Sequence, residues 1–130
     1  MPPPAGYPKL EPTPRKANPT LNLTPAEQAW LDEYRQTLAN DYPGLVEDII
    51  IFGSKARGDA GPDSDLDVLV VLTEADRRLK DEIAYLGYLL DAFGDALPSI
   101  MVYSRTEWTE RERDGSPFHR AVTRDGVHVA

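Results

Sequence analysis

Two short groups of residues, ten positions apart, combine side chains that suit chemistry on a triphosphate. Gly53-Ser54 ends one apolar run of the chain, and Asp65-Leu66-Asp67 opens the next. A glycine after a strand lets the backbone approach a phosphate, and a serine adds a hydroxyl and a backbone N–H group. Two carboxylates that alternate around a leucine point to one face of a strand and suit a hard divalent cation. Together the two groups predict a site for a nucleoside triphosphate and its metal.

Either group alone is a weak signal, because most glycine–serine pairs form plain turns and an Asp-x-Asp pair also begins many polar strands. The spacing strengthens both, since a loop over residues 55–64 is of the right kind to bring Ser54 back over Asp65. Two carboxylates on one face also repel each other unless a cation lies between them. Lys55 and Arg57 would place positive charge beside the triphosphate or the departing pyrophosphate, and their alternative role is a solvated loop.

The elements that must hold these groups can be predicted from the hydrophobic pattern. Strands are expected at 46–52, at 66–72, where the apolar run suggests burial on both faces, and at 97–103. A helix should start at the capping box Thr24-Pro25-Ala26-Glu27 and end at Tyr42. Further elements are expected as a helical turn after Ser54, helices at 74–93, 106–113 and 116–124, and a short strand at 127–129. This order predicts an α/β (α+β) fold with a small mixed sheet and helices packed mainly on one face.

One folded domain is expected over residues 24–130, preceded by a tail. Residues 1–23 carry prolines at positions 2, 3, 4, 8, 12, 14 and 19, which is typical of an extended or disordered segment. Such a tail is either simply solvated or an arm that docks on a partner. The size of the remaining domain is sufficient for a hydrophobic core.

Composition excludes several kinds of site. The chain has no cysteine, so a metal would need oxygen or imidazole ligands, which favours Mg²⁺ or Mn²⁺. His119 and His128 are the only histidines and are not spaced as metal ligands. The formal net charge of −8 disfavours binding to a long nucleic acid. Neither a membrane span nor a signal peptide is visible in the sequence, so we expect a cytoplasmic protein without a membrane partner.

The residues around both groups resemble a known family. Phe-Gly-Ser-Lys-Ala-Arg-Gly at 52–58, followed by Asp-Ser-Asp-Leu-Asp-Val-Leu-Val at 63–70, is similar to the signature of the DNA polymerase beta-like nucleotidyltransferase superfamily. The resemblance is greatest to its minimal, antitoxin-type members. It is dense over residues 52–72 and looser over 45–128.

The resemblance implies a two-metal mechanism. Asp65 and Asp67 would hold two Mg²⁺ (or Mn²⁺) ions, one lowering the pKa of an attacking hydroxyl and one binding the triphosphate. Gly53 and Ser54 would grip the β- and γ-phosphates. The implied reaction transfers a nucleoside monophosphate, AMP if the donor is ATP, to a hydroxyl of a protein or small molecule. The implied partners are ATP or another nucleoside triphosphate and a HEPN-type toxin that an antitoxin would adenylylate.

The chain departs from the family pattern at the third carboxylate, which the family usually carries on the next strand. The run 97–103 contains no acid, and Ser99 stands roughly where that acid is expected. Asp95 would reach the site only if the strand started earlier. The alternative function is therefore a degenerate module, catalytically weak or inactive, that binds a nucleotide or a partner. A small-molecule enzyme of the aminoglycoside type is disfavoured, because no substrate domain follows.

Overall fold

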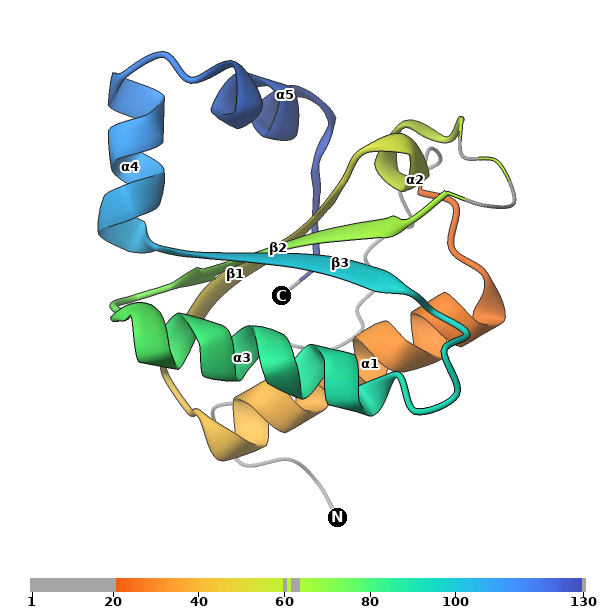
Figure 1. Ribbon diagram of the computed structural model, residues 1–130. Helices are drawn as coiled ribbons and strands as arrows, with labels where there is room; N and C mark the ends of the chain where they lie inside the picture. Colours follow the sequence, from red (N-terminus) through yellow and green to blue (C-terminus); the bar gives the residue numbers. More distant parts are fainter. Residues whose placement is uncertain (1–20, 60, 62–63, 130) are drawn as a thin grey trace.

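The computed structural model describes residues 21–59, 61 and 64–129, and the predicted order of elements is confirmed (Figure 1). The elements are α1 Pro25–Asp41, β1 Val46–Phe52, α2 Ser54–Arg57, β2 Leu66–Leu72, α3 Arg77–Leu90, β3 Pro98–Ser104, α4 Arg105–Arg113, α5 Pro117–Asp125 and β4 Val127–His128. Among the helices of the described residues, none combines the length and the apolar composition that crossing a membrane requires.

The first two strands have the limits that the sequence predicts, whereas two later elements differ. The helix expected at 74–93 forms only over α3, because Asp76 caps it by accepting the N–H of Leu79 at 2.9 Å. The strand expected at 97–103 is shifted by one residue. Leu97 has φ +49, a left-handed conformation that an extended strand cannot contain, so β3 starts at Pro98.

The sheet has the strand order β3-β2-β1-β4 and is mixed, as expected. β1 pairs antiparallel with β2 and β4, and β2 pairs parallel with β3. Every residue of β2 except Asp67 is buried, which agrees with the prediction of a strand covered on both faces. Alternate side chains of this strand therefore serve two different layers.

The two longest helices, α1 and α3, cover one face of the sheet (Figure 1). Trp30, Tyr34 and Leu38, which recur every four residues on α1, are buried there, and the polar ring atoms of the first two are satisfied by the backbone of α3. Trp30 Nε1 donates to the carbonyl of Gly87 at 2.8 Å, and Tyr34 Oη donates to that of Ile83 at 2.8 Å. A Cβ on Gly87 would lie 2.4 Å from Ile100 Cδ1, so the absence of a side chain lets α3 approach β3 closely.

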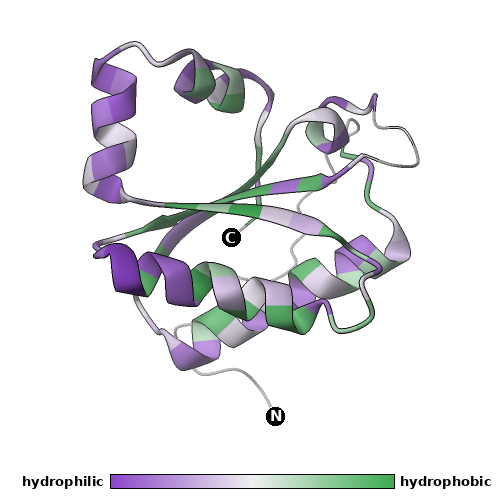
Figure 2. Cartoon of the chain, in the orientation of Figure 1, coloured by the Kyte–Doolittle hydropathy of each residue, from purple (hydrophilic) through white to green (hydrophobic). Residues whose placement is uncertain are grey.

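The opposite face is covered only in part, by α4 and α5 (Figure 1). Leu69 and Val71 of β2 pack there against Trp108 of α4 and Val122 of α5. Trp108 is the only buried residue of α4, and Figure 2 shows most of that helix as hydrophilic. Asp67 lies on the same face as Leu69 and Val71 but is only half-buried, so this face remains accessible at the start of β2.

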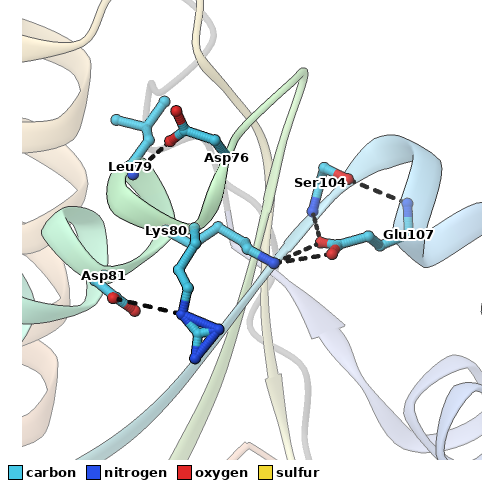
Figure 3. Close-up of polar contacts among 7 residues, drawn as sticks. Asp76, Leu79, Lys80, Asp81, Ser104 and Glu107 are labelled. Atoms are coloured by element: carbon cyan, nitrogen blue, oxygen red, sulfur yellow. Dashed lines mark hydrogen bonds and ion pairs between the residues drawn. The ribbon is translucent and has the colours of Figure 1, made fainter.

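The outer edge of β3 is protected rather than left open for another strand. Pro98 has no N–H group, the N–H of Ile100 donates to Tyr88 Oη at 3.0 Å, and that of Ser104 donates to Glu107 Oε1 at 2.9 Å. Figure 3 shows Lys80 Nζ reaching from α3 to the same carboxylate, at 2.8 Å from Oε2. Because these groups occupy the edge, addition of a partner strand is disfavoured there.

Residues 21–23, which the tail prediction included, contact the domain. Leu21 and Leu23 pack against the core under α1, and the N–H of Asn22 donates to the carbonyl of Lys55 at 3.0 Å. The rest of the predicted tail, residues 1–20, lies outside the described residues.

Candidate functional site

The β1–β2 hairpin brings the two predicted groups together. Phe52, the last residue of β1, lies opposite Asp67, so Gly53 emerges directly beside that carboxylate. Gly53 has φ 74 and ψ −155, a combination that is almost restricted to glycine. A Cβ at this position would lie 2.3 Å from Asp67 Oδ2. The turn and the acid are therefore in contact, and both the backbone conformation and the space available require glycine.

The acid pair lies at the start of β2. Asp65 directly precedes the strand and is exposed, whereas Asp67 is half-buried. Burial raises the pKa of Asp67, and the neighbouring Asp65 carboxylate raises that pKa further. The guanidinium of Arg57 has the opposite effect and lowers the pKa of Asp67. A cation between the two carboxylates would relieve the same repulsion that a proton relieves.

Ser54 and Arg57 form the two ends of α2, beside the acids. Ser54 follows Gly53 and is half-buried, and its carbonyl accepts the N–H groups of Gly58 and Asp59 at 2.9 and 3.2 Å. Arg57 is about half exposed, with Nε 3.3 Å from Asp59 Oδ2. Its electrostatic effect on Asp67 shows that its charge acts at the acid pair.

Lys55, which the sequence also predicts to bind the nucleotide, has a buried side chain that pairs with an acid of α1. Its Nζ lies 3.0 Å from Glu27 Oε2, and the two side chains are only 6% and 5% exposed. The sequence predicts Glu27 only as part of a capping box, which is confirmed because Glu27 Oε1 accepts the N–H of Thr24 at 2.9 Å. Its second role, holding Lys55, has no local signal in the sequence.

Ser99, the residue that the family resemblance relates to a third carboxylate, lies beside Asp67 in the sheet. The parallel register of β2 and β3 pairs Asp67 with Ser99, so both side chains share one face of the sheet. Asp95 is exposed and precedes β3 by three residues, outside this register. Two acids, Asp65 and Asp67, and the serine are therefore placed together at the start of β2 and β3.

The donor set fits a hard divalent cation in company with a nucleotide. Within residues 21–59, 61 and 64–129, no group of three or more histidine, aspartate or glutamate side chains could hold a metal. Mg²⁺, however, is commonly bound by one or two carboxylates, with water and substrate phosphates completing its shell. Asp65 and Asp67 are suited to that arrangement, since their mutual repulsion favours a cation.

Both histidines and Tyr103 have structural contacts in the fold. His128 Nδ1 lies 2.7 Å from Asp48 Oδ2, and the ring of His119 is 4.5 Å from that of Trp108. Tyr103 packs edge-on against Trp108, with ring centroids 5.3 Å apart. Tyr85, in contrast, is 62% exposed on α3.

Apolar surface borders the site at β3. Leu97 and Met101, two residues before and after Ser99, are 62% and 37% exposed, and the nearby Phe93 is 89% exposed. Met101 also lines a hollow of about 570 Å³ between β3 and α4, together with Tyr103 and residues of α4. The surroundings of Ser99 thus differ chemically from the charged turn around Gly53.

Comparisons with known proteins bear on the family of the chain. The family model of the nucleotidyltransferase domain matches residues 31–116. A curated relative from Methanocaldococcus jannaschii, provisionally named a protein adenylyltransferase, is 31% identical over 100 residues. The match covers 77% of this chain and 94% of the relative.

Solved structures share the fold. A crystal structure described as a toxin–antitoxin with AMP-PNP aligns at a TM-score of 0.50, with 20% identity over 76% of this chain and 72% of that one. A provisionally named nucleotidyltransferase from Sulfolobus solfataricus aligns at a TM-score of 0.48, with 25% identity over 78% of each chain.

Proposed function

The chain belongs to the nucleotidyltransferase family, as its sequence resemblance indicated, and we propose that it transfers AMP from ATP to a hydroxyl group of a protein. The observation that carries the proposal is the contact between Gly53 and Asp67. A Cβ on Gly53 would lie 2.3 Å from Asp67 Oδ2, so a phosphate bound at the turn would lie beside the acid pair. A triphosphate and its cation could then be held at one place.

The chemistry is an in-line displacement at the α-phosphorus. The acceptor oxygen forms a bond to that phosphorus, the bond from phosphorus to the bridging oxygen breaks, and pyrophosphate leaves. Mg²⁺ held by Asp65 and Asp67 would neutralise phosphate charge and lower the pKa of the acceptor hydroxyl. The turn at Gly53 and Ser54 would orient the β- and γ-phosphates, so that the α-phosphorus faces the acceptor.

Arg57 is the basic residue whose position suits the leaving group. Its charge acts on Asp67, and its side chain is about half exposed, so it can turn toward an anion beside the acids. The ion pair of Arg57 with Asp59 is exposed and therefore contributes little to stability. Arg57 would stabilise the charge that develops on the departing pyrophosphate.

A protein acceptor is supported by the surface beside Ser99. Met101, two residues after Ser99 on β3, and Leu97, just before β3, expose apolar surface at this strand, which is typical of a protein contact and unsuited to a small polar acceptor. The relative from Methanocaldococcus jannaschii carries the name of an enzyme that acts on proteins. The family resemblance further suggests a HEPN-type toxin as the acceptor, with this chain as its antitoxin.

The test uses ATP labelled at either the α- or the γ-phosphate, with Mg²⁺ and a HEPN-type protein as the acceptor. Transfer of the α-label alone, lost in Asp65→Asn and Asp67→Asn, is the expected result. Transfer of the γ-label would instead indicate a kinase-like reaction. If both variants transfer AMP at the wild-type rate, the acid pair is not the catalytic site.

A second function, nucleotide binding without turnover, is favoured by Ser99. Because Ser99 pairs with Asp67 on the same face, no protein carboxylate stands beside the acid pair on β3 to accept the proton of the acceptor. Such a module would be stabilised by ATP and Mg²⁺ in thermal unfolding but would transfer no label. Measuring both quantities on one sample separates the two functions.

A further inference from the structure

We propose that Glu27 and Lys55 are positioning residues that hold the phosphate-binding turn against Asp67, and that Lys55 acts through this pair rather than by touching the nucleotide. This inference rests on the proposed nucleotide site. It concerns a buried ion pair between α1 and α2 whose two partners are 3.0 Å apart.

The pair is part of a continuous set of bonds between the start of α1 and α2. One carboxylate oxygen of Glu27 accepts the N–H of Thr24, and the other pairs with Lys55 Nζ. The carbonyl of Lys55 accepts the N–H of Asn22 at 3.0 Å. The backbone and the side chain of Lys55 are thus both held by residues 22–27. The four-residue helix α2 has little stability of its own, so these bonds determine where it lies.

The location of α2 matters because the turn begins next to it. Ser54 precedes Lys55, and Gly53 has no free space on the side of Asp67, since even a methyl group there would overlap the carboxylate. A small displacement of α2 would therefore change the distance between the phosphate-binding backbone and the acids. Groups that support ligand-binding residues in this way typically affect affinity or activity about 10–100-fold when they are removed.

Because the pair is buried, substituting one partner should impair nucleotide binding more than substituting both. Removing one partner leaves the other as an unpaired charge in a site that is about 95% inaccessible to water. Replacing both partners by neutral side chains of similar shape leaves no such charge. A direct contact between Lys55 and phosphate would behave differently, because the double variant would still lack the ammonium group.

The experiment is a double-mutant cycle of Glu27→Gln, Lys55→Met and the combined variant, in the full chain with its acceptor. Glutamine keeps an oxygen for the capping box, so Glu27→Gln removes the charge while the start of α1 is retained. Glu33→Gln, an exposed position on the same helix, is the matched control. The readouts are KM for ATP with Mg²⁺, kcat, and the Kd of a non-hydrolysable ATP analogue, each measured well below the unfolding temperature of the variant.

We expect each single variant to raise KM and Kd about 10–100-fold with a much smaller change in kcat, since the turn grips ground state and transition state alike. The double variant should recover to within about threefold of the wild type, because it leaves no unpaired buried charge. A double variant as impaired as Lys55→Met would show that Lys55 contacts the nucleotide directly. Unchanged constants in all three variants would also overturn the inference while leaving the proposed function standing. A wild-type chain that binds no nucleotide would overturn both.

Discussion

Replacing Ser99 by aspartate should restore a third carboxylate to the site. The β2–β3 register pairs Ser99 with Asp67, and both lie on the accessible face of the sheet. Ser99 is exposed, so the new side chain needs no cavity. The substitution should therefore have opposite effects on the free protein and on the protein bound to metal and nucleotide.

The magnitudes follow from the strand spacing. Neighbouring strands are about 4.8 Å apart, and two charges at that distance repel by about 1 kcal/mol in water and about 3 kcal/mol at an effective dielectric constant near 20. Because Ser99 is exposed and Asp67 is half-buried, we expect a loss near 1 kcal/mol without metal. This corresponds to a Tm lower by about 4–8 °C for a domain of this size. When metal and nucleotide are bound, the same carboxylate can accept the proton of the acceptor hydroxyl. A general base of this kind typically raises the rate of transfer about 10²–10⁴-fold.

The assay compares thermal unfolding with and without Mg²⁺ and ATP, and measures transfer of AMP in parallel. Ser99→Asn is the matched control, because asparagine has nearly the shape of aspartate but carries no charge and accepts no proton from the acceptor. It should leave the stability of the free chain and the rate of transfer close to those of the wild type. Asp95→Ala should have little effect. If Ser99→Asp gives no gain while Asp95→Ala abolishes transfer, Asp95 is the third ligand and our reasoning from the register is wrong.

Further changes test the remaining parts of the site. Asp67→Asn should abolish transfer and raise the stability of the metal-free chain at neutral pH, because the raised pKa of Asp67 means that its charge opposes folding. Metal-free wild-type stability should rise as the pH falls through the raised pKa of Asp67, and equal pH profiles for wild type and variant would contradict this. Gly53→Ala should lower the free energy of unfolding by about 1–3 kcal/mol and abolish transfer. Gly61→Ala should do neither, because a Cβ at Gly61 would meet no atom within 4 Å. A fully active Gly53→Ala would refute the close contact with Asp67. Lys80→Met should lower the free energy of unfolding by at most about 1 kcal/mol at neutral pH, because the ion pair with Glu107 is partly exposed. That loss should fade as acid protonates Glu107 through its lowered pKa, and a loss independent of pH would argue for packing instead.

Much of the fold could be predicted because its signals are local. The capping box at Thr24 and Glu27 and the limits of β1 and β2 are confirmed, since each depends on residues within a few positions of one another. The start of β3 was misplaced by one residue. The left-handed conformation of Leu97, held by Asp91, whose Oδ2 accepts the N–H of Leu97 at 3.0 Å, leaves no periodic pattern in the sequence.

The candidate site could likewise be predicted only in part. The spacing between Gly53 and Asp67 is characteristic of a hairpin that returns a turn to an acid, and the fold brings those two residues into contact. The nucleotide contacts predicted for Ser54 and Arg57 stay predictions that the proposed experiments test. The spacing does not predict the direction of the Lys55 side chain, because a side chain in a short turn can point to solvent, to a ligand or into the core.

The amino-acid sequence alone predicts the order of the elements, the limits of β1 and β2, the family and the absence of an acid on β3. These follow from hydrophobic periodicity, turn residues and a motif that lie within short stretches of chain. Two contacts are visible only in the folded structure: Lys55 is buried against Glu27, and Ser99 lies beside Asp67. Both depend on how separate elements pack: α1 must lie next to α2, and the crossover through α3 must set the register of β3. Such contacts between distant residues are selected by the burial and charge of the whole core, which no local pattern contains.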